Sequence, residues 1–307
     1  MTTIEWTEQT WNPTTGCDRI SPGCDNCYAL TMAKRLKGMG SAKYQTDGDP
    51  RTSGPGFALS THADTLTEPL HWKKPRKVFV NSMSDLFHAR VPRDFLAQVF
   101  AVMAATPQHT YQILTKRPER AARILTDLCT CGTGHPPGEH FRSSMEWAAT
   151  SHSPTYVPGL EHGTYHRSGW PLPNVWIGTS IESDKYTRRA DALRKTPAAI
   201  RFISAEPLLG PLHDLKLHGI DWLIIGGESG PGARPFQPAW AAELIDRARQ
   251  DNTAPFVKQF GTHWARDRSI GGSTVFSLGD TKGGVPAHWP AHLRVREYPT
   301  TTEAPRG

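Results

Sequence analysis

The chain has 307 residues, with 35 Lys and Arg against 29 Asp and Glu, and a formal net charge of +6. This length allows one or two domains and can bury a substantial core without the help of disulfides. The basic excess is compatible with an anionic partner such as nucleic acid but does not establish one. The five cysteines are an odd and clustered set, which argues against a secreted disulfide framework.

The N-terminus has neither a basic start nor an apolar run, so we expect no signal peptide. No segment approaches the roughly 20 apolar residues that a membrane-spanning helix needs. We therefore expect a cytoplasmic protein without membrane contact, in which thiols stay reduced and can bind metal.

The predicted elements begin with a helix at residues 28–37, where Ala29, Leu30, Ala33 and Leu36 recur at helical spacing. A Gly-, Pro- and Thr-rich connection without clear periodicity follows at 40–70. From there on, short apolar runs alternate with amphipathic segments. The apolar runs predict strands at 77–81, 111–115, 174–178, 200–204, 221–226 and 255–258. The amphipathic segments predict helices at 93–105, 118–128, 183–195 and 238–250.

This alternation is typical of an α/β fold with a parallel sheet and helices outside it. Periodicity alone does not separate a β/α barrel from an open doubly wound sheet. Residues 129–172 interrupt the alternation with a His-, Gly-, Pro- and Ser-rich stretch, which we interpret as an inserted loop region. We predict one unit over residues 1–262 that carries this insertion, and a C-terminal tail at 263–307 that is partly loose.

Three cysteines near the N-terminus carry the strongest chemical signal. Cys17, Cys24 and Cys27 follow the spacing C-x6-C-x2-C in a Gly- and Pro-containing loop, directly before the first predicted helix. Three thiolates can hold three irons of a 4Fe-4S cluster and leave the fourth iron open to a small molecule. A structural zinc site with a fourth ligand from elsewhere, an electron-transfer cluster and three unrelated thiols stay open as alternatives.

The same region carries a family resemblance. The motifs WNPTTGC at 11–17 and CDNCYA at 24–29 resemble the opening of an uncharacterised family of phage and bacterial proteins regarded as similar to radical S-adenosylmethionine (SAM) enzymes. The resemblance continues through NSMSDLFH at 81–88, LTKRP at 114–118, SAEPLLG at 204–210, GGESG at 226–230 and KQ at 258–259. It implies a partial β/α barrel of radical SAM type, a 4Fe-4S cluster on the three cysteines, bound SAM, and an external electron donor of the flavodoxin or ferredoxin type.

Two features depart from the commonest radical SAM pattern. The first gap has six residues where three are usual, and Asn26 precedes the last cysteine where an aromatic residue is usual. The second departure puts the usual adenine contact in doubt. Tyr28 is the substitute that we consider for this contact.

Polar residues follow each predicted strand, at the end of a β/α barrel where active sites lie. By strand order, the resemblance implies that Asn81, Ser82 and Asp85 contact the amino group of SAM. It also implies that Lys116 or Arg117 pairs with the SAM carboxylate. The structural alternative is that strand-ending loops are polar anyway and that such residues cap the next helix.

The later strands supply the remaining candidates. The resemblance implies that Ser180, Glu182 and Glu206 bind ribose hydroxyls. The candidates left for the substrate are Glu228, Lys258 and Gln259.

A second group of metal-ligand residue types lies inside the predicted insertion: Cys129, Cys131, His135 and His140. A Cys/His-rich tract of this kind can bind zinc. The spacing matches no common zinc-finger pattern, and an ordinary loop stays open as the alternative.

These features together predict reductive cleavage of SAM to a 5′-deoxyadenosyl radical that acts on an unknown substrate. Basic charge and phage association favour nucleic acid as that substrate. Two other classes stay open: an Fe-S or zinc-dependent nucleic-acid-binding module without catalysis, and a nuclease-like or methyl-transfer enzyme. The missing Gly-rich SAM loop after the first strand argues against methyl transfer.

Overall fold

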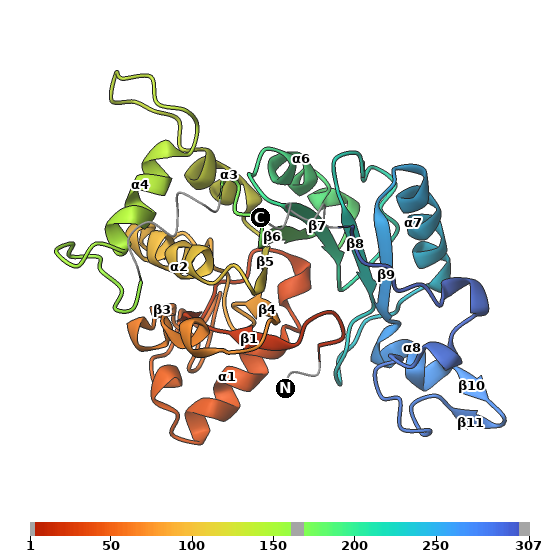
Figure 1. The fold of residues 1–307 in the computed structure, drawn as a ribbon. Coiled ribbons are helices and arrows are strands. Elements are labelled where there is room, and N and C mark those ends of the chain that lie inside the picture. Colours follow the sequence, from red (N-terminus) through yellow and green to blue (C-terminus); the bar gives the residue numbers. More distant parts are fainter. Residues whose placement is uncertain (1–3, 161–168, 301–307) are drawn as a thin grey trace.

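The computed structural model describes residues 4–160 and 169–300. Its centre is a seven-stranded sheet in the order β1-β4-β5-β6-β7-β8-β9, in which all neighbouring strands are parallel. These strands are β1 Gln9–Trp11, β4 Lys77–Val80, β5 Thr110–Thr115, β6 Val175–Ser180, β7 Ile200–Ala205, β8 Trp222–Gly226 and β9 Ala254–Gln259. The sheet curls without closing and forms a half barrel with helices around it (Figure 1).

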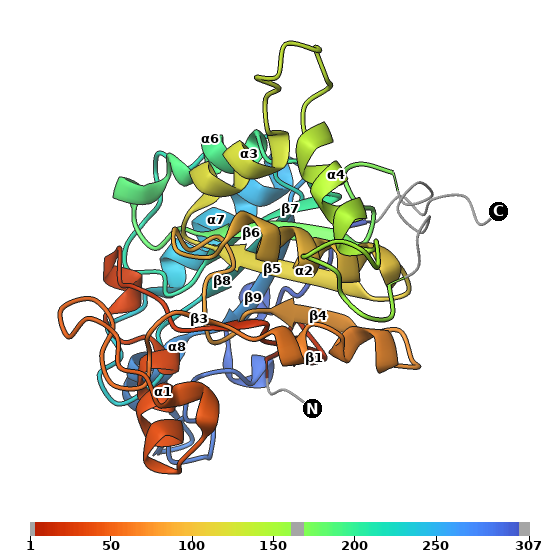
Figure 2. The ribbon, with the colours of Figure 1, turned by 90° about the vertical axis from the view of Figure 1, so that its left-hand side faces the viewer.

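The strands join the sheet in chain order, so successive right-handed crossovers place their helices on the same, outer face. Figure 2 shows α2, α3, α4 and α6 on one side of the sheet. The helices are α1 Tyr28–Gly38, α2 Arg93–Ala105, α3 Pro118–Thr126, α4 Glu139–Ala148, α6 Arg189–Arg194, α7 Pro238–Gln250 and α8 Gly261–Asp267. All six predicted strands are confirmed, and the α/β class with a partial barrel is confirmed as well.

The outer face of the sheet carries the main hydrophobic core. Ile113, Ile177 and Ile203 are fully buried there, in one cluster with Leu96 and Phe100 of α2. Side chains alternate between the two faces of a strand, so the residues between these positions point into the half barrel. The side chains of the inner face are therefore a different set from those of the main hydrophobic core.

That inner face changes character along the strands. At its amino end it is closed by an apolar cluster of Trp6, Phe79, Trp176, Ile200, Phe202, Trp222, Ile224 and Phe256. Trp6 lies against Phe79, Phe202 and Trp222, with ring centroids 4.8, 6.1 and 6.0 Å apart. Further toward the carboxyl ends of the strands, the inward positions are Asn81, Ser180, Ser204 and Lys258, all of which line a cavity. We call the apolar cluster the barrel floor.

The insertion and the tail hold more structure than their composition indicates. Helix α4 lies within the insertion, and its Phe141 packs edge-on against Phe100 of α2 at 5.3 Å. The expected domain boundary at 262 falls inside α8, and beyond it Trp289 and Leu293 are buried. Residues 161–168 of the insertion and 301–307 of the tail lie outside the described residues.

Candidate functional site

A cavity of about 700 Å³ lies at the carboxyl ends of the strands. Its lining contains every residue predicted for the site except Glu182: Cys17, Cys24, Cys27, Tyr28, Asn81, Ser82, Asp85, Lys116, Arg117, Ser180, Glu206, Glu228, Lys258 and Gln259. The sequence-based grouping of these residues at one rim therefore agrees with the structure. Their contacts divide them into residues that hold the cysteine loop and residues that face the cavity.

The three cysteines lie on a loop between β2 Thr14–Thr15 and α1. Pro22–Cys24 form a short 3₁₀ turn, and the Cys27 amide donates to the Cys24 carbonyl at 3.3 Å. Gly16 starts the loop at φ +84°, and a Cβ there would lie 2.1 Å from the Ala58 carbonyl oxygen. Only glycine fits that position, so the entry to the cysteine loop is fixed by backbone contact.

Glu182 does not line the cavity, because its side chain turns toward the cysteine loop and contacts it from the end of β6. Its carboxylate is fully buried, accepts a hydrogen bond from the Gly23 amide at 3.3 Å, and pairs with Arg189 at 3.0 Å. Gly23 directly precedes Cys24. The end of β6 therefore positions the middle of the cysteine loop.

Glu228, after β8, holds the next part of the loop. Its carboxylate accepts hydrogen bonds from Asn26 at 3.0 Å and from the Arg234 side chain at 2.9 and 2.5 Å. Arg234 also donates to the Pro22 carbonyl at 2.9 Å. Burial raises the pKa of Glu228, but the hydrogen bonds from Arg234 and Asn26 outweigh it and hold the pKa below its usual range.

Asp85 and Arg117 hold the first cysteine. Asp85 accepts hydrogen bonds from the Thr115 hydroxyl at 2.7 Å and from Arg117 at 2.8 Å. Arg117 lies 3.6 Å from the Cys17 sulfur and donates to the Asp18 carbonyl at 3.2 Å. Burial, and then the nearby Asp85, raise the pKa of the Cys17 thiol to about 12, although Arg117 opposes this rise. A metal that binds here displaces the thiol proton.

Asn81 and Ser82 also make contacts within the protein. Asn81 has a left-handed backbone (φ 63°), and its amide exchanges hydrogen bonds with the Thr14 hydroxyl and backbone amide at 2.8 and 3.2 Å. The Ser82 hydroxyl donates to the Asn12 side chain at 3.1 Å, and the Tyr28 hydroxyl donates to the Ser82 carbonyl. These bonds fasten the loop after β4 to the segments on either side of the cysteine loop.

The remaining polar groups face the cavity. Lys258 pairs with Glu206 at 2.6 Å, with both side chains less than one-fifth exposed. Gln259 instead turns to the Gly227 carbonyl at 3.0 Å. Within residues 4–160 and 169–300, the Lys116 ammonium and the Ser180 hydroxyl have no hydrogen-bond partner although both residues line the cavity. They are therefore available to a ligand.

Sequence reasoning missed four residues that complete this site. Asn12, Arg189 and Arg234 each hold a predicted residue, and Asn26, recognised only as a departure, holds Glu228. Asn12 and Asn26 lie in the motifs around the cysteines, which is a signal that could have found them. Arg189 and Arg234 follow no pattern, since Arg189 reaches Glu182 from the start of α6 and Arg234 joins Glu228 to the cysteine loop only in the folded chain.

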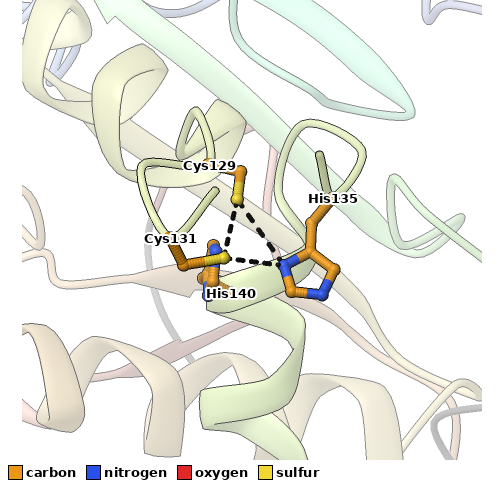
Figure 3. A group of neighbouring side chains, drawn as sticks. All are labelled: Cys129, Cys131, His135 and His140. Carbon is orange, nitrogen blue, oxygen red and sulfur yellow. Dashed lines mark hydrogen bonds between the residues drawn. The ribbon is translucent and has the colours of Figure 1, made fainter. Parts of the chain in front are cut away.

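The four metal-ligand residue types of the insertion do not line the cavity. Figure 3 shows Cys129, Cys131 and His135 of the loop between α3 and α4 and His140 of the first turn of α4 turned toward one another. One potential ligand atom from each lies within 4.8 Å of the others. The group can therefore bind a metal ion.

Comparisons with known proteins give one match. The sequence model of a family described as "Protein of unknown function (DUF5131)" matches residues 1–294. No curated protein and no solved structure matches the chain. In the described part of the chain, none of the helices has the length and apolar composition needed to cross a bilayer.

Proposed function

Because this chain belongs to the family described as "Protein of unknown function (DUF5131)", its activity has to be inferred from the site, and we propose that it is a radical SAM enzyme. Cys17, Cys24 and Cys27 would hold a 4Fe-4S cluster, with SAM beside it in the cavity. When bound, the cluster supplies one electron, received from a flavodoxin- or ferredoxin-type donor, that splits SAM into methionine and a 5′-deoxyadenosyl radical.

One observation carries the proposal. The three thiols line a single cavity at the carboxyl ends of a half barrel, and the described lining contains neither a fourth cysteine nor a histidine. A structural zinc site or an electron-transfer cluster normally takes four protein ligands. A cluster on three thiolates leaves one iron for a small molecule, and about 700 Å³ is within the range of small-molecule sites.

The contacts assign the predicted residues to two tasks. Asp85, Glu182 and Glu228 hold the cysteine loop, so we assign them to positioning rather than to ligand contact. Lys116 has an unpaired ammonium in the cavity, and we assign it to the carboxylate of SAM. Burial raises the pKa of the Cys27 thiol, and the positive charge of Lys116 opposes this rise.

Ser180 is assigned to a ribose hydroxyl, and the Glu206–Lys258 pair to the ribose or the substrate. A hydroxyl without a partner can both donate and accept, which suits a vicinal diol. The barrel floor closes the cavity from the opposite end and keeps water away from a reactive intermediate.

Nucleic acid is the substrate class that we propose first. A second hollow shares Asn26, Cys27 and Tyr28 with the cavity and is lined by the exposed side chains of Arg19, Lys34 and Arg35. These three cations form no ion pair within the described ranges. A row of unpaired cations next to an active site can bind a phosphate backbone.

The test is anaerobic reconstitution of the full chain with iron and sulfide, followed by reduction with dithionite in the presence of SAM and chromatography for 5′-deoxyadenosine. We expect about four irons per chain and SAM cleavage, both lost in C17A, C24A and C27A. Cys131→Ala is the matched control, because Cys131 does not line the cavity. An iron content in C24A equal to that of the native chain would overturn the proposal. A colourless protein with zinc on these cysteines would favour the binding module.

A further inference from the structure

The loop between α3 and α4, together with the first turn of α4, carries a second group of ligands that the proposed function does not use. We propose that Cys129, Cys131, His135 and His140 bind one structural Zn²⁺, independently of the cluster and of SAM. The ion would join the end of α3 (Pro118–Thr126) to the start of α4 (Glu139–Ala148).

The geometry of the donors is the first argument. The His135 Nδ1 lies 3.6 Å from the Cys129 sulfur and 3.4 Å from the Cys131 sulfur (Figure 3). Zinc bonds of about 2.3 Å to sulfur and 2.0 Å to nitrogen place tetrahedral S and N ligands roughly 3.5 Å apart. The His140 ring stands edge-on to His135, with centroids 4.9 Å apart, and completes the set.

The two sulfurs lie 3.0 Å apart, and both cysteines are free thiols. Two thiolates on one zinc ion sit about 3.8 Å apart, so the sulfurs need to separate by less than 1 Å. Cys131 and its neighbours in the loop are exposed, so this movement meets no packed core. The thiols release their protons when the metal binds.

The loop is not held by the hydrophobic core, which is the second argument. Residues 130–137 are all exposed and contribute nothing to the hydrophobic clusters. Gly132 and Gly134 adopt left-handed conformations (φ 83° and 71°), which turn the chain so that His135 faces the cysteine pair. A short exposed segment without a core is commonly ordered by a metal ion.

The chemistry of the donors selects the ion and its role. Two thiolates and two imidazoles suit Zn²⁺, whereas Mg²⁺ and Ca²⁺ prefer oxygen ligands. Four protein ligands fill a tetrahedral ion and leave no position for substrate, so the site is structural. Because α4 packs on α2 through Phe141 and Phe100, the ion would stabilise the position of α4.

Elemental analysis of the full chain, purified without added iron and exchanged into Zn²⁺, tests the inference. We expect one zinc per chain in the native protein and in a C17A/C24A/C27A variant, and none in C129S or H135A. Substitution with Co²⁺ should give the visible d–d absorption of a tetrahedral dithiolate site. His152→Ala is the matched control, because His152 is an exposed histidine of the same insertion outside the group.

Limited proteolysis of the native chain tests the same inference without any substitution, so a misfolded variant cannot decide the outcome. A chelator added to the native chain should expose residues 127–138 to cleavage, and Zn²⁺ should restore protection. Native protein without zinc, zinc retained in C129S, or a mass two hydrogens lower from a Cys129–Cys131 disulfide would each overturn the inference. Loss of zinc only in the C17A/C24A/C27A variant would place the metal in the cavity and overturn it as well. SAM cleavage plays no part in these readouts, so the proposed function stands or fails separately.

Discussion

Arg117, just after β5, connects the sheet to Cys17, the first of the three cysteines. Its guanidinium is 14% exposed and lies between the buried Asp85 carboxylate and the Cys17 sulfur. In Arg117→Met, Asp85 stays buried without its cation, so we expect unfolding in urea to cost about 3 kcal/mol less than in the native chain. Iron content after reconstitution should fall as well. Lys116→Gln, which removes the neighbouring cation but breaks no pair, is the control; an equal loss in both variants would contradict the role of Arg117.

Lys116 is expected to act on the ligand and not on the fold. A charge-assisted hydrogen bond to a carboxylate contributes about 1.5–3 kcal/mol, so Lys116→Gln should weaken SAM binding by roughly 10- to 100-fold. Iron content and stability should stay at native levels. Anaerobic titration calorimetry of the reconstituted protein measures this, with exposed Lys195→Gln as the control. Unchanged SAM affinity would remove Lys116 from the site.

Among the elements, the loop after β8 stabilises the cysteine loop through Glu228. The lowered pKa of Glu228 means that this carboxylate binds a proton more readily in the unfolded state than in the folded state. The stabilisation is therefore complete above the ordinary Glu pKa of 4.5 and is lost as the pH falls through the lower folded value. We expect Glu228→Gln to lose about 2 kcal/mol at pH 7, and the difference from the native chain to shrink below pH 4.5.

Urea unfolding at several pH values measures this difference. Glu243→Gln is the matched control, because Glu243 is 40% exposed and its pair with Arg247 spans 3.5 Å. An exposed pair of this kind contributes no more than about 1 kcal/mol. A Glu228→Gln deficit that is independent of pH would show that the carboxylate is not ionised in the folded state.

The elements also show what sequence periodicity can predict. The runs of Val78–Val80 and Trp222–Ile225 are buried on both faces, so their strands stand out as continuous apolar segments. β1 has only Gln9, Thr10 and Trp11 and pairs on one edge alone, so no apolar run marks it. Helix α4 was missed because its apolar residues lie in a polar, Gly-rich context.

At the scale of the whole molecule, the location of the site was more predictable than the contacts among its residues. Parallel strands bring their carboxyl ends to one rim, so chain order alone grouped Asn81, Ser180 and Lys258. Which of these residues stay free depends on loops that meet from distant parts of the chain. Glu182 and Gly23 are an example, since 159 positions separate them.

The barrel floor connects global stability to the site. Trp6 is 3% exposed, lies against three aromatic rings of the sheet, and also lines the cavity. Its deletion removes a large side chain from a packed cluster and opens the floor to water, so Trp6→Ala should lower the free energy of unfolding by about 3–5 kcal/mol. The same opening should lower SAM cleavage in the reconstituted protein, because water then reaches the cavity from its apolar end.

Two matched variants separate packing from other effects of the substitution. Trp6→Phe keeps most of the aromatic contact, and because the buried Trp6 indole N–H has no partner among residues 4–160 and 169–300, this change breaks no hydrogen bond there. Its loss should stay below about 1.5 kcal/mol. Trp147→Ala removes a tryptophan that is 58% exposed and should leave stability within about 0.5 kcal/mol of native. Equal losses of unfolding free energy in Trp6→Ala and Trp147→Ala would mean that the N-terminal segment does not close the half barrel. Other residues would then have to shield the apolar inner face from water.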